Sequence, residues 1–231
     1  PMGAWLTQRT EFLGQVLSND HGVNSAPKSK ERNMKKQLIV IAALAAMGMG
    51  VAQAQQSPWM IRARAVNLDM ANKDQTAAGL DLSVNNKTIP EIDISYFITK
   101  NIAAELILTV PQEQKVYAAG TQIGTFKHLP PTLTLQYHFT DLGAYKPYVG
   151  AGLNYTAINK ESIAGGAATL SGSSWGPAFQ VGVDFPIDKN WSINVDVKKI
   201  YIKSNVYLGG VDQGYLKLDP VAVGVGVGYR F

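Results

Sequence analysis

Nine charged residues lie at alternate positions within segments that otherwise alternate between apolar and polar side chains. They are Arg62, Arg64, Glu91, Asp93, Glu105, Asp184, Asp196, Lys198 and Arg230. Successive side chains of a β-strand point to opposite faces, so all nine belong to the face opposite the apolar residues. Acids and bases gathered on one face pair with one another, and the sequence therefore predicts a lumen ion-pair network if these strands close around an interior.

Other candidate residues do not support a catalytic or metal site. The segment Gly172–Gly176 matches the Gly-x-Ser-x-Gly pattern around Ser174, but that pattern needs a sharp turn that leads into a helix. Here a loop of small residues precedes Ser174 and a strand follows it. His128 and His138 lack the grouping of metal ligands, and the chain has no cysteine. We expect hydrogen-bonding roles for both histidines, no catalytic residue, no metal, no cofactor and no enzyme activity.

The elements that must position these side chains are eight alternating segments. They cover residues 59–68, 89–98, 102–110, 132–139, 148–157, 177–185, 191–201 and 221–231. In the last segment one face carries four valines followed by Tyr229 and Phe231, and the other carries small residues and Arg230. One apolar face and one compact face are typical of a transmembrane β-barrel. A buried strand of a soluble sandwich is the alternative, whereas a dinucleotide loop is excluded because no helix follows the glycines.

The connections between these segments alternate in length. Those at 99–101, 140–146 and 186–190 are short, and those at about 69–88, 111–127, 158–174 and 203–217 are long. Aromatic residues gather near the short connections, as at a membrane interface. They are Trp59, Phe139, Tyr145, Tyr148, Phe185, Trp191, Tyr229 and Phe231. The pattern predicts an all-β fold: an eight-stranded antiparallel transmembrane β-barrel with four long external loops and short periplasmic turns.

The segment that precedes the barrel has the features of an export signal. Met34-Lys35-Lys36 is basic, residues 38–51 are apolar, and Ala52-Gln53-Ala54 fits a cleavage site. We therefore expect an upstream extension outside the fold at 1–33, a signal peptide at 34–54, and a barrel at 55–231 in the bacterial cell outer membrane. Six of 21 basic and three of 17 acidic residues precede residue 55, which leaves 15 and 14. That balance does not indicate nucleic-acid binding.

Two successive prolines interrupt the barrel wall. Pro130 and Pro131 have no backbone N–H and cannot donate ladder hydrogen bonds, so they mark an edge or an opening. Two interpretations stay open: a loop-to-strand junction without further role, or a lateral opening at Leu129, Pro130 and Pro131. An eight-stranded barrel is just wide enough for its own side chains or one small ligand. A lower half filled with paired charges would therefore favour a sideways exit for a solute.

Several motifs occur in a specific order and spacing over residues 55–231. They are Asn101–Leu106, His128–Leu133, Lys146–Thr156, Ser174–Gly176, Gln180–Asp184, Leu218–Pro220 and Gly228–Phe231. In these motifs the chain resembles the outer membrane protein W (OmpW) family. The resemblance implies a hydrophobic lumen and passive uptake of small hydrophobic molecules, as in the related AlkL-type alkane importers, with release between the third and fourth strands of the barrel.

The same resemblance implies roles for four further residues. Ile107 and Trp175 would form a constriction of the channel, although strand parity places Trp175 on the lipid-facing side. Tyr229 and Phe231 are similar to the C-terminal signal that the barrel assembly machinery recognises. The expected partners are outer-membrane lipid, small hydrophobic solutes and that machinery during biogenesis, and the barrel is expected to be a monomer.

Two other functions remain open at this point. One is a structural or stress-defence surface barrel without transport, which purely polar packing up to the external loops would favour. The other is a lipid-modifying enzyme, for which the sequence offers no convincing nucleophile and base. Departures from the family pattern lie mainly in the long loops that would shape the entrance, so the sequence leaves the identity of the substrate open.

Overall fold

The structure, a computed structural model, describes residues 57–77 and 79–231. The expected upstream extension and signal peptide lie outside the described residues. Fifteen strands and one 3-10 turn, η1 (Ala164–Gly166), make up the fold. The strands are β1 (Trp59–Asp69), β2 (Lys73–Thr76), β3 (Leu82–Val84), β4 (Lys87–Phe97), β5 (Ile102–Thr109), β6 (Gln112–Ala118), β7 (Thr121–Leu129), β8 (Thr132–His138), β9 (Lys146–Ile163), β10 (Ala168–Leu170), β11 (Ser173–Pro186), β12 (Trp191–Ile200), β13 (Lys203–Leu208), β14 (Val211–Lys217) and β15 (Val221–Arg230).

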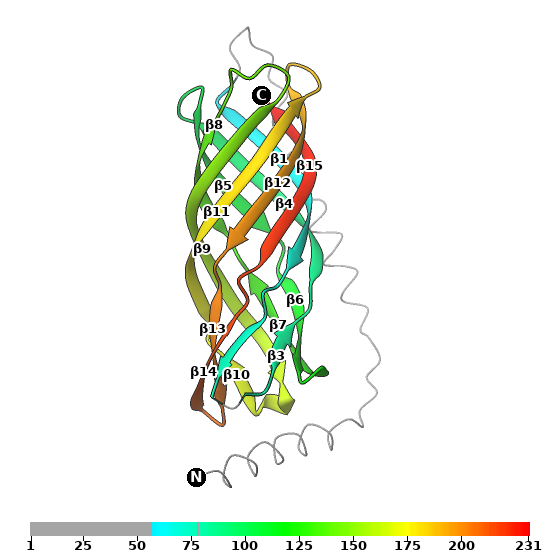
Figure 1. Cartoon of the computed structure of the whole chain (residues 1–231), viewed down its shortest axis with the longest axis vertical. Coiled ribbons are helices and arrows are strands. Elements are labelled where there is room, and N and C mark those ends of the chain that lie inside the picture. The colour runs from blue at the N-terminus through cyan, green and yellow to red at the C-terminus, as the bar shows by residue number, and fades with distance from the viewer. Residues whose placement is uncertain (1–56, 78) are drawn as a thin grey trace.

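Eight of these strands close into an antiparallel barrel, as the sequence predicts. Their order is β11-β12-β15-β1-β4-β5-β8-β9, and β9 pairs back with β11. The terminal strand β15 lies between β1 and β12, with Arg230 opposite Met60 and Tyr229 opposite Trp191. The strands are steeply tilted around the barrel (Figure 1). Among the described residues, no helix is long and apolar enough to cross a membrane.

The outer surface of the barrel carries an apolar band. Large exposed side chains in this band come from all eight barrel strands, and Leu135 of β8, Leu153 of β9 and Phe179 of β11 are examples. Lipid tails cannot hydrogen-bond, so a closed barrel with an apolar exterior is the only sheet that they accommodate. Aromatic rings ring the short-turn end, where Trp191 and Tyr229 pack at 4.9 Å between centroids. The band and its aromatic rim mark the part of the barrel that lies in the membrane.

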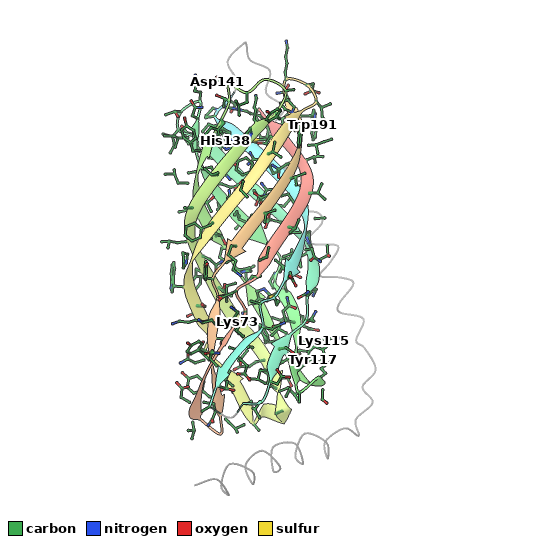
Figure 2. The ribbon with its side chains drawn as sticks, viewed as in Figure 1. Lys73, Lys115, Tyr117, His138, Asp141 and Trp191 are labelled. Atoms are coloured by element: carbon green, nitrogen blue, oxygen red, sulfur yellow. The ribbon has the colours of Figure 1, made fainter. Side chains whose placement is uncertain are left out.

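The four long segments, expected as loops, instead fold largely as strands that continue the barrel beyond this band. Strands β2, β3, β6, β7, β10, β13 and β14, with the second half of β9, form this extension at the bottom of Figure 1. Its pattern is inverted relative to the band: on β6, Glu113 and Lys115 face outward and Val116 and Ala118 face inward. Figure 2 shows Lys73 and Lys115 on the extension and Trp191 at the opposite end. The outer face therefore changes from apolar to polar where the barrel leaves the membrane.

The C-terminal residue, Phe231, joins the last barrel strand to the first, and its deletion is expected to reduce assembly. The Phe231 N–H donates to Trp59 O at 3.2 Å, its carbonyl accepts from Ser57 N at 2.6 Å, and its ring packs on Tyr229. Deleting Phe231 should lower the amount of folded protein in the outer membrane, measured as the heat-modifiable band on gels of membrane fractions. Phe139→Ala, which removes another aromatic of the rim, is the control. Equal folded amounts in the two variants would contradict the prediction.

Candidate functional site

The lumen at the level of the membrane is filled by ion pairs around Arg62. This side chain is fully buried, and its guanidinium contacts Glu105 at 2.9 Å and Asp184 at 2.7 Å. Ser95 accepts a further hydrogen bond from Arg62 Nη1 at 2.9 Å. Parity within β1 turns Arg62 inward, and β5 and β11 bring the two carboxylates to it from different sides of the barrel.

A second set of ion pairs lies directly beside the first. Arg64 contacts Asp93 at 3.0 Å and Glu91 at 3.2 Å. Lys198 contacts Glu91 and Asp196, both at 2.7 Å. Together with the pairs of Arg62, three cations meet five carboxylates, and all eight side chains are buried. This layer occupies the barrel axis, so we expect it to block an axial path.

Arg230 does not join this network, contrary to the expectation from strand parity. It is only half-buried, its Nε donates to Ser57 O at 3.2 Å, and its guanidinium lies 3.9 Å from the centre of the Phe97 ring. Among the described residues, no carboxylate lies within ion-pair distance of it. The reason is its position along the barrel axis. Arg230 is the last residue of β15 and lies at the periplasmic mouth, farther from the extension than the carboxylates are.

Tyr148 joins the network, although the sequence placed it in the aromatic rim. Its ring is fully buried, and its hydroxyl accepts from Arg64 at 3.2 Å and donates to Asp196 at 2.8 Å. The ring lies over Gly182, where a Cβ atom would come within 2.4 Å of it. The sequence held the signal for this arrangement, since the parity of β9 turns Tyr148 inward and an inward glycine lies opposite it in register.

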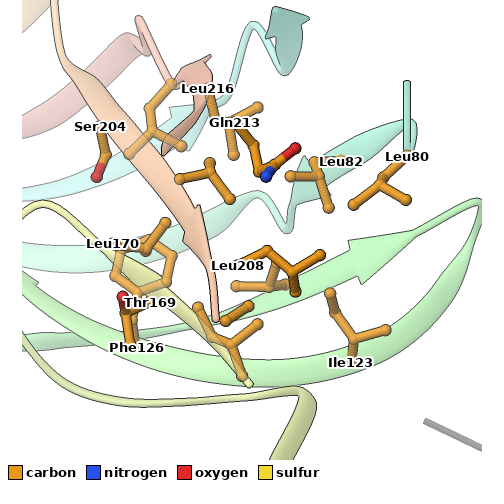
Figure 3. Close-up of a pocket in the computed structure, with 15 residues that line it drawn as sticks. Leu80, Leu82, Ile123, Phe126, Thr169, Leu170, Ser204, Leu208, Gln213 and Leu216 are labelled. Carbon is orange, nitrogen blue, oxygen red and sulfur yellow. The ribbon is translucent and has the colours of Figure 1, made fainter. Parts of the chain in front are cut away.

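Beyond the ion pairs, on the side of the extension, the lumen is apolar. A cavity there is lined mainly by apolar side chains, among them Leu82, Ile123, Phe126, Leu208 and Leu216 (Figure 3). The cavity is tight, with room for roughly one water molecule. Thus the lumen has two layers, a closed charged layer in the membrane and a tight apolar cavity outside it.

The two residues expected to form a constriction lie on opposite faces of the wall. Ile107 is buried in the lumen, opposite Asp93 on β4 and Thr132 on β8, between the ion pairs and the cavity. Trp175 does not face the lumen. Its side chain is 68% exposed on the outer surface, where it packs on Tyr155 at 4.8 Å between centroids. The alternation of inward and outward side chains continues through Gly176-Pro177, so the strand has no irregularity there that would turn Trp175 inward.

The wall has a seam at Pro130-Pro131. The ladder between β5 and β8 ends at Ile107 opposite Thr132, and the ladder between β6 and β7 begins only at Gln112 opposite His128. Residues 108–111 and 129–131 therefore have no partners across this seam. The Val110 carbonyl accepts instead from the Gln112 side chain at 2.7 Å. Pro111 adds a third residue without an N–H to the same place.

The other side of the prolines is tied to the barrel. The Asn154 side chain donates to Pro130 O at 3.2 Å, to Pro131 O at 3.3 Å and to Thr132 Oγ1 at 2.8 Å. Tyr155 N also donates to Pro131 O at 3.0 Å. The ladder is therefore interrupted on only one side of β7–β8, the side that faces β5–β6.

A comparable interruption elsewhere is bridged, which sets the seam apart. Between β12–β13 and β14–β15 the ladder also breaks, but Ile200 N donates to Pro220 O at 3.1 Å and Leu218 N to Ile202 O at 2.9 Å. Among the backbone hydrogen bonds described outside the regular ladders, none joins residues 108–111 to residues 129–131. The seam at Pro130-Pro131 is thus a weak line in the wall at the level of Ile107.

The remaining candidate residues have structural surroundings. Ser174 lies inside strand β11, not at a strand-to-helix turn, and its Oγ accepts from Lys203 N at 3.1 Å. His138 hydrogen-bonds Gln136 at 2.9 Å and stacks on Tyr148. Within the described part of the chain, no group of three or more histidine, cysteine or acidic residues is arranged to hold a metal ion. His128 lies buried beside the seam.

Comparisons with known proteins place this barrel among outer-membrane proteins. The OmpW family model matches residues 55–231. Protein y4mB of Sinorhizobium fredii, an uncharacterized outer-membrane protein, is 46% identical over 184 residues, covering 76% of this chain and 80% of that protein. The dibenzothiophene metabolism operon protein PahQ of Pseudomonas aeruginosa is 30% identical over 191 residues, covering 77% and 90%. The structure of outer membrane protein AlkL in DMPC lipid bilayers aligns with a TM-score of 0.60 and 26% identity, covering 79% of this chain and 93% of that chain.

Proposed function

The chain belongs to the OmpW family of outer-membrane barrels, and we propose that it is a passive channel for small hydrophobic molecules, which it releases sideways into the membrane. A solute would reach the apolar cavity of the extension from outside, pass Ile107, and leave through the seam at Pro130-Pro131. The protein carries out no chemical step in this proposal. Its work is to offer an apolar solute a path that avoids a polar surface.

The observation that carries the proposal is the order of the layers in the lumen. An apolar cavity ends on a layer of buried ion pairs, and the seam in the wall lies at the boundary between the two. An apolar solute gains free energy when it leaves water for the cavity. It gains nothing by moving on among buried charges that already have partners. The wall seam is then the path of least resistance from the cavity to lipid.

The small cavity volume sets a condition on the proposed transport. A cavity with room for roughly one water molecule does not admit an organic solute, so the lining side chains or the hairpins that carry them must move apart first. The lining comes from seven different strands, among them the short β3 and β10. Short strands at the far end of a barrel have few ladder bonds, and local opening is least costly there.

The relatives support the same class of solute. The name of PahQ links that protein to an operon of dibenzothiophene metabolism, and dibenzothiophene is an apolar aromatic molecule. A structural or stress-defence barrel without transport is the second candidate. The ion-pair layer favours it, because a filled lumen stabilises a barrel whether or not solutes pass. The apolar cavity and the seam are not needed for such a role.

Uptake by cells with and without the protein tests the proposal. Cells that carry it should accumulate small apolar aromatic molecules faster, with no change for a hydrophilic solute of similar size. Leu216→Asn, which puts an amide into the cavity, should reduce that uptake. Val211→Asn makes a similar change on the exposed surface of the same strand and is the matched control. Equal uptake by cells with and without the protein would leave the structural role as the better explanation.

A further inference from the structure

Two polar side chains without partners lie between the cavity and the seam. Gln114 is fully buried, and neither its Nε2 nor its Oε1 has a hydrogen-bond partner among the described residues. His128 is 2% exposed, and its Nδ1 likewise has no partner there. A buried amide without a partner destabilises the fold, because it has lost its hydrogen bonds to water and gained none in the protein. Such a cost is tolerated where something else, a water molecule or a ligand, completes the hydrogen bonds.

Both side chains face the space through which a solute would pass. Gln114 pairs with Phe126 in the register of β6 and β7, and it lies next to Val116 on the inward face of β6. Phe126 and Val116 both line the cavity. His128 is on the inward face of β7, with its ring 5.9 Å from that of Phe126 and two residues before Pro130. The pair therefore occupies the step between the apolar cavity and the opening in the wall.

The state of His128 suits a neutral ligand. Burial, and then the nearby charge of Lys87, lower the pKa of His128 to about 4. The residue lies outside the apolar band, since its outward neighbour Lys127 pairs with Glu113 at 3.7 Å. A neutral imidazole has one donor and one acceptor nitrogen, and the glutamine amide also has both. The two side chains can thus hydrogen-bond a hydroxyl or a carbonyl group, and they carry no charge that would demand an ion.

We propose that Gln114 and His128 bind the single polar group of an otherwise hydrophobic solute while its apolar part occupies the cavity. This inference rests on the proposed channel function and narrows its substrate class. Phenols, alcohols and ketones would be preferred over hydrocarbons of the same shape. A site built to hydrogen-bond a hydroxyl discriminates against the analogue without it, because its own polar groups then stay unpaired.

Naphthalene and naphthol form a matched pair of fluorescent probes that differ by one hydroxyl. For each probe, the measured quantity is the ratio of uptake by cells with the protein to uptake by cells without it. This ratio should be larger for naphthol than for naphthalene. Gln114→Met and His128→Leu should each reduce naphthol uptake about five- to ten-fold, which corresponds to one lost hydrogen bond. Uptake of naphthalene should stay unchanged or rise. Gln122→Met, the same substitution at an exposed position of β7, should change neither.

A binding measurement tests the site independently of transport. In purified protein in lipid nanodiscs, naphthol should shift the imidazole nitrogen resonances of His128, and naphthalene should not. His138 has partners in the ion-pair layer and provides an internal control in the same spectrum.

The outcomes separate the site from the channel. If wild-type cells take up neither probe, the channel function fails, and the nitrogen spectrum alone then decides the site. If cells take up both probes and the variants reduce both equally, or if naphthol leaves His128 unchanged, the polar site is overturned. A bound water molecule would then be the partner of Gln114.

Discussion

Replacing Arg62 with methionine is expected to lower the free energy of unfolding by about 3–5 kcal/mol. The substitution leaves the Glu105 and Asp184 carboxylates buried without the guanidinium that contacts both. Breaking a buried ion pair from one side is costly because the remaining charge loses its partner without regaining water. Asp184 loses the ion pair with Arg62, whereas Glu105 keeps Arg64 at 3.6 Å. Urea unfolding of the refolded barrel in detergent micelles, followed by tryptophan fluorescence, measures the change.

Two further variants separate the loss of a charge from the loss of a side chain. Arg230→Met removes an arginine that has no ion-pair partner among the described carboxylates, and it should cost far less than Arg62→Met. Combining Arg62→Met with Glu105→Gln and Asp184→Asn removes the stranded charges and should recover much of the loss. If Arg62→Met and Arg230→Met prove equally stable, the network does not hold the barrel together.

Closing the seam is expected to abolish most uptake of hydrophobic solutes. Pro130→Thr combined with Pro131→Val gives both residues a backbone N–H. Successive N–H groups point to opposite neighbouring strands, so one of the two faces residues 108–111, and the ladder between β5–β6 and β7–β8 can continue. A solute in the cavity would then face a closed wall above a closed charged layer. Uptake of naphthol, measured in cells with equal surface amounts of folded protein, should fall nearly to that of cells without it.

Prolines elsewhere in the barrel provide the matched control. Pro90→Thr combined with Pro177→Val changes two outward prolines in strands that are paired on both sides, and uptake should stay normal. Hydrophilic solutes should be unaffected in both double variants. Full retention of hydrophobic uptake in a well-folded Pro130→Thr, Pro131→Val protein would return the two prolines to the role of a plain loop junction.

The membrane part of the fold follows directly from the sequence, and the extension does not. Within the band the pattern is apolar outside and polar inside, with β-branched and aromatic residues that have high strand propensity. Beyond the band the same strands invert, with Glu113 and Lys115 outside and Val116 inside. The strands of these segments are short, rich in glycine and polar overall, so their sequence pattern resembles that of loops. The structure adds that these long segments fold largely as strands.

The site was predictable in its charges and not in its positions along the barrel axis. Parity places Arg62 and Arg230 on the same face, but only height decides which of them meets carboxylates. Parity also places Trp175 outside, and the structure agrees with parity and not with the role implied by resemblance. Gln114 could not be singled out, because a polar residue on an inward face has no special signal until its missing partners are known.

The stacking of the lumen separates the residues that hold the barrel together from those that meet a solute. The ion pairs lie within the membrane band, whereas the cavity beyond it is lined by residues of β3, β6, β7, β9, β10, β13 and β14. Substitutions at well-separated sites have nearly additive effects on stability. The residues that line the cavity can therefore change for new solutes while the ion pairs that stabilise the fold stay the same. Diversity among related barrels should accumulate in the extension, and an engineer who seeks new selectivity can work there without redesigning the membrane half.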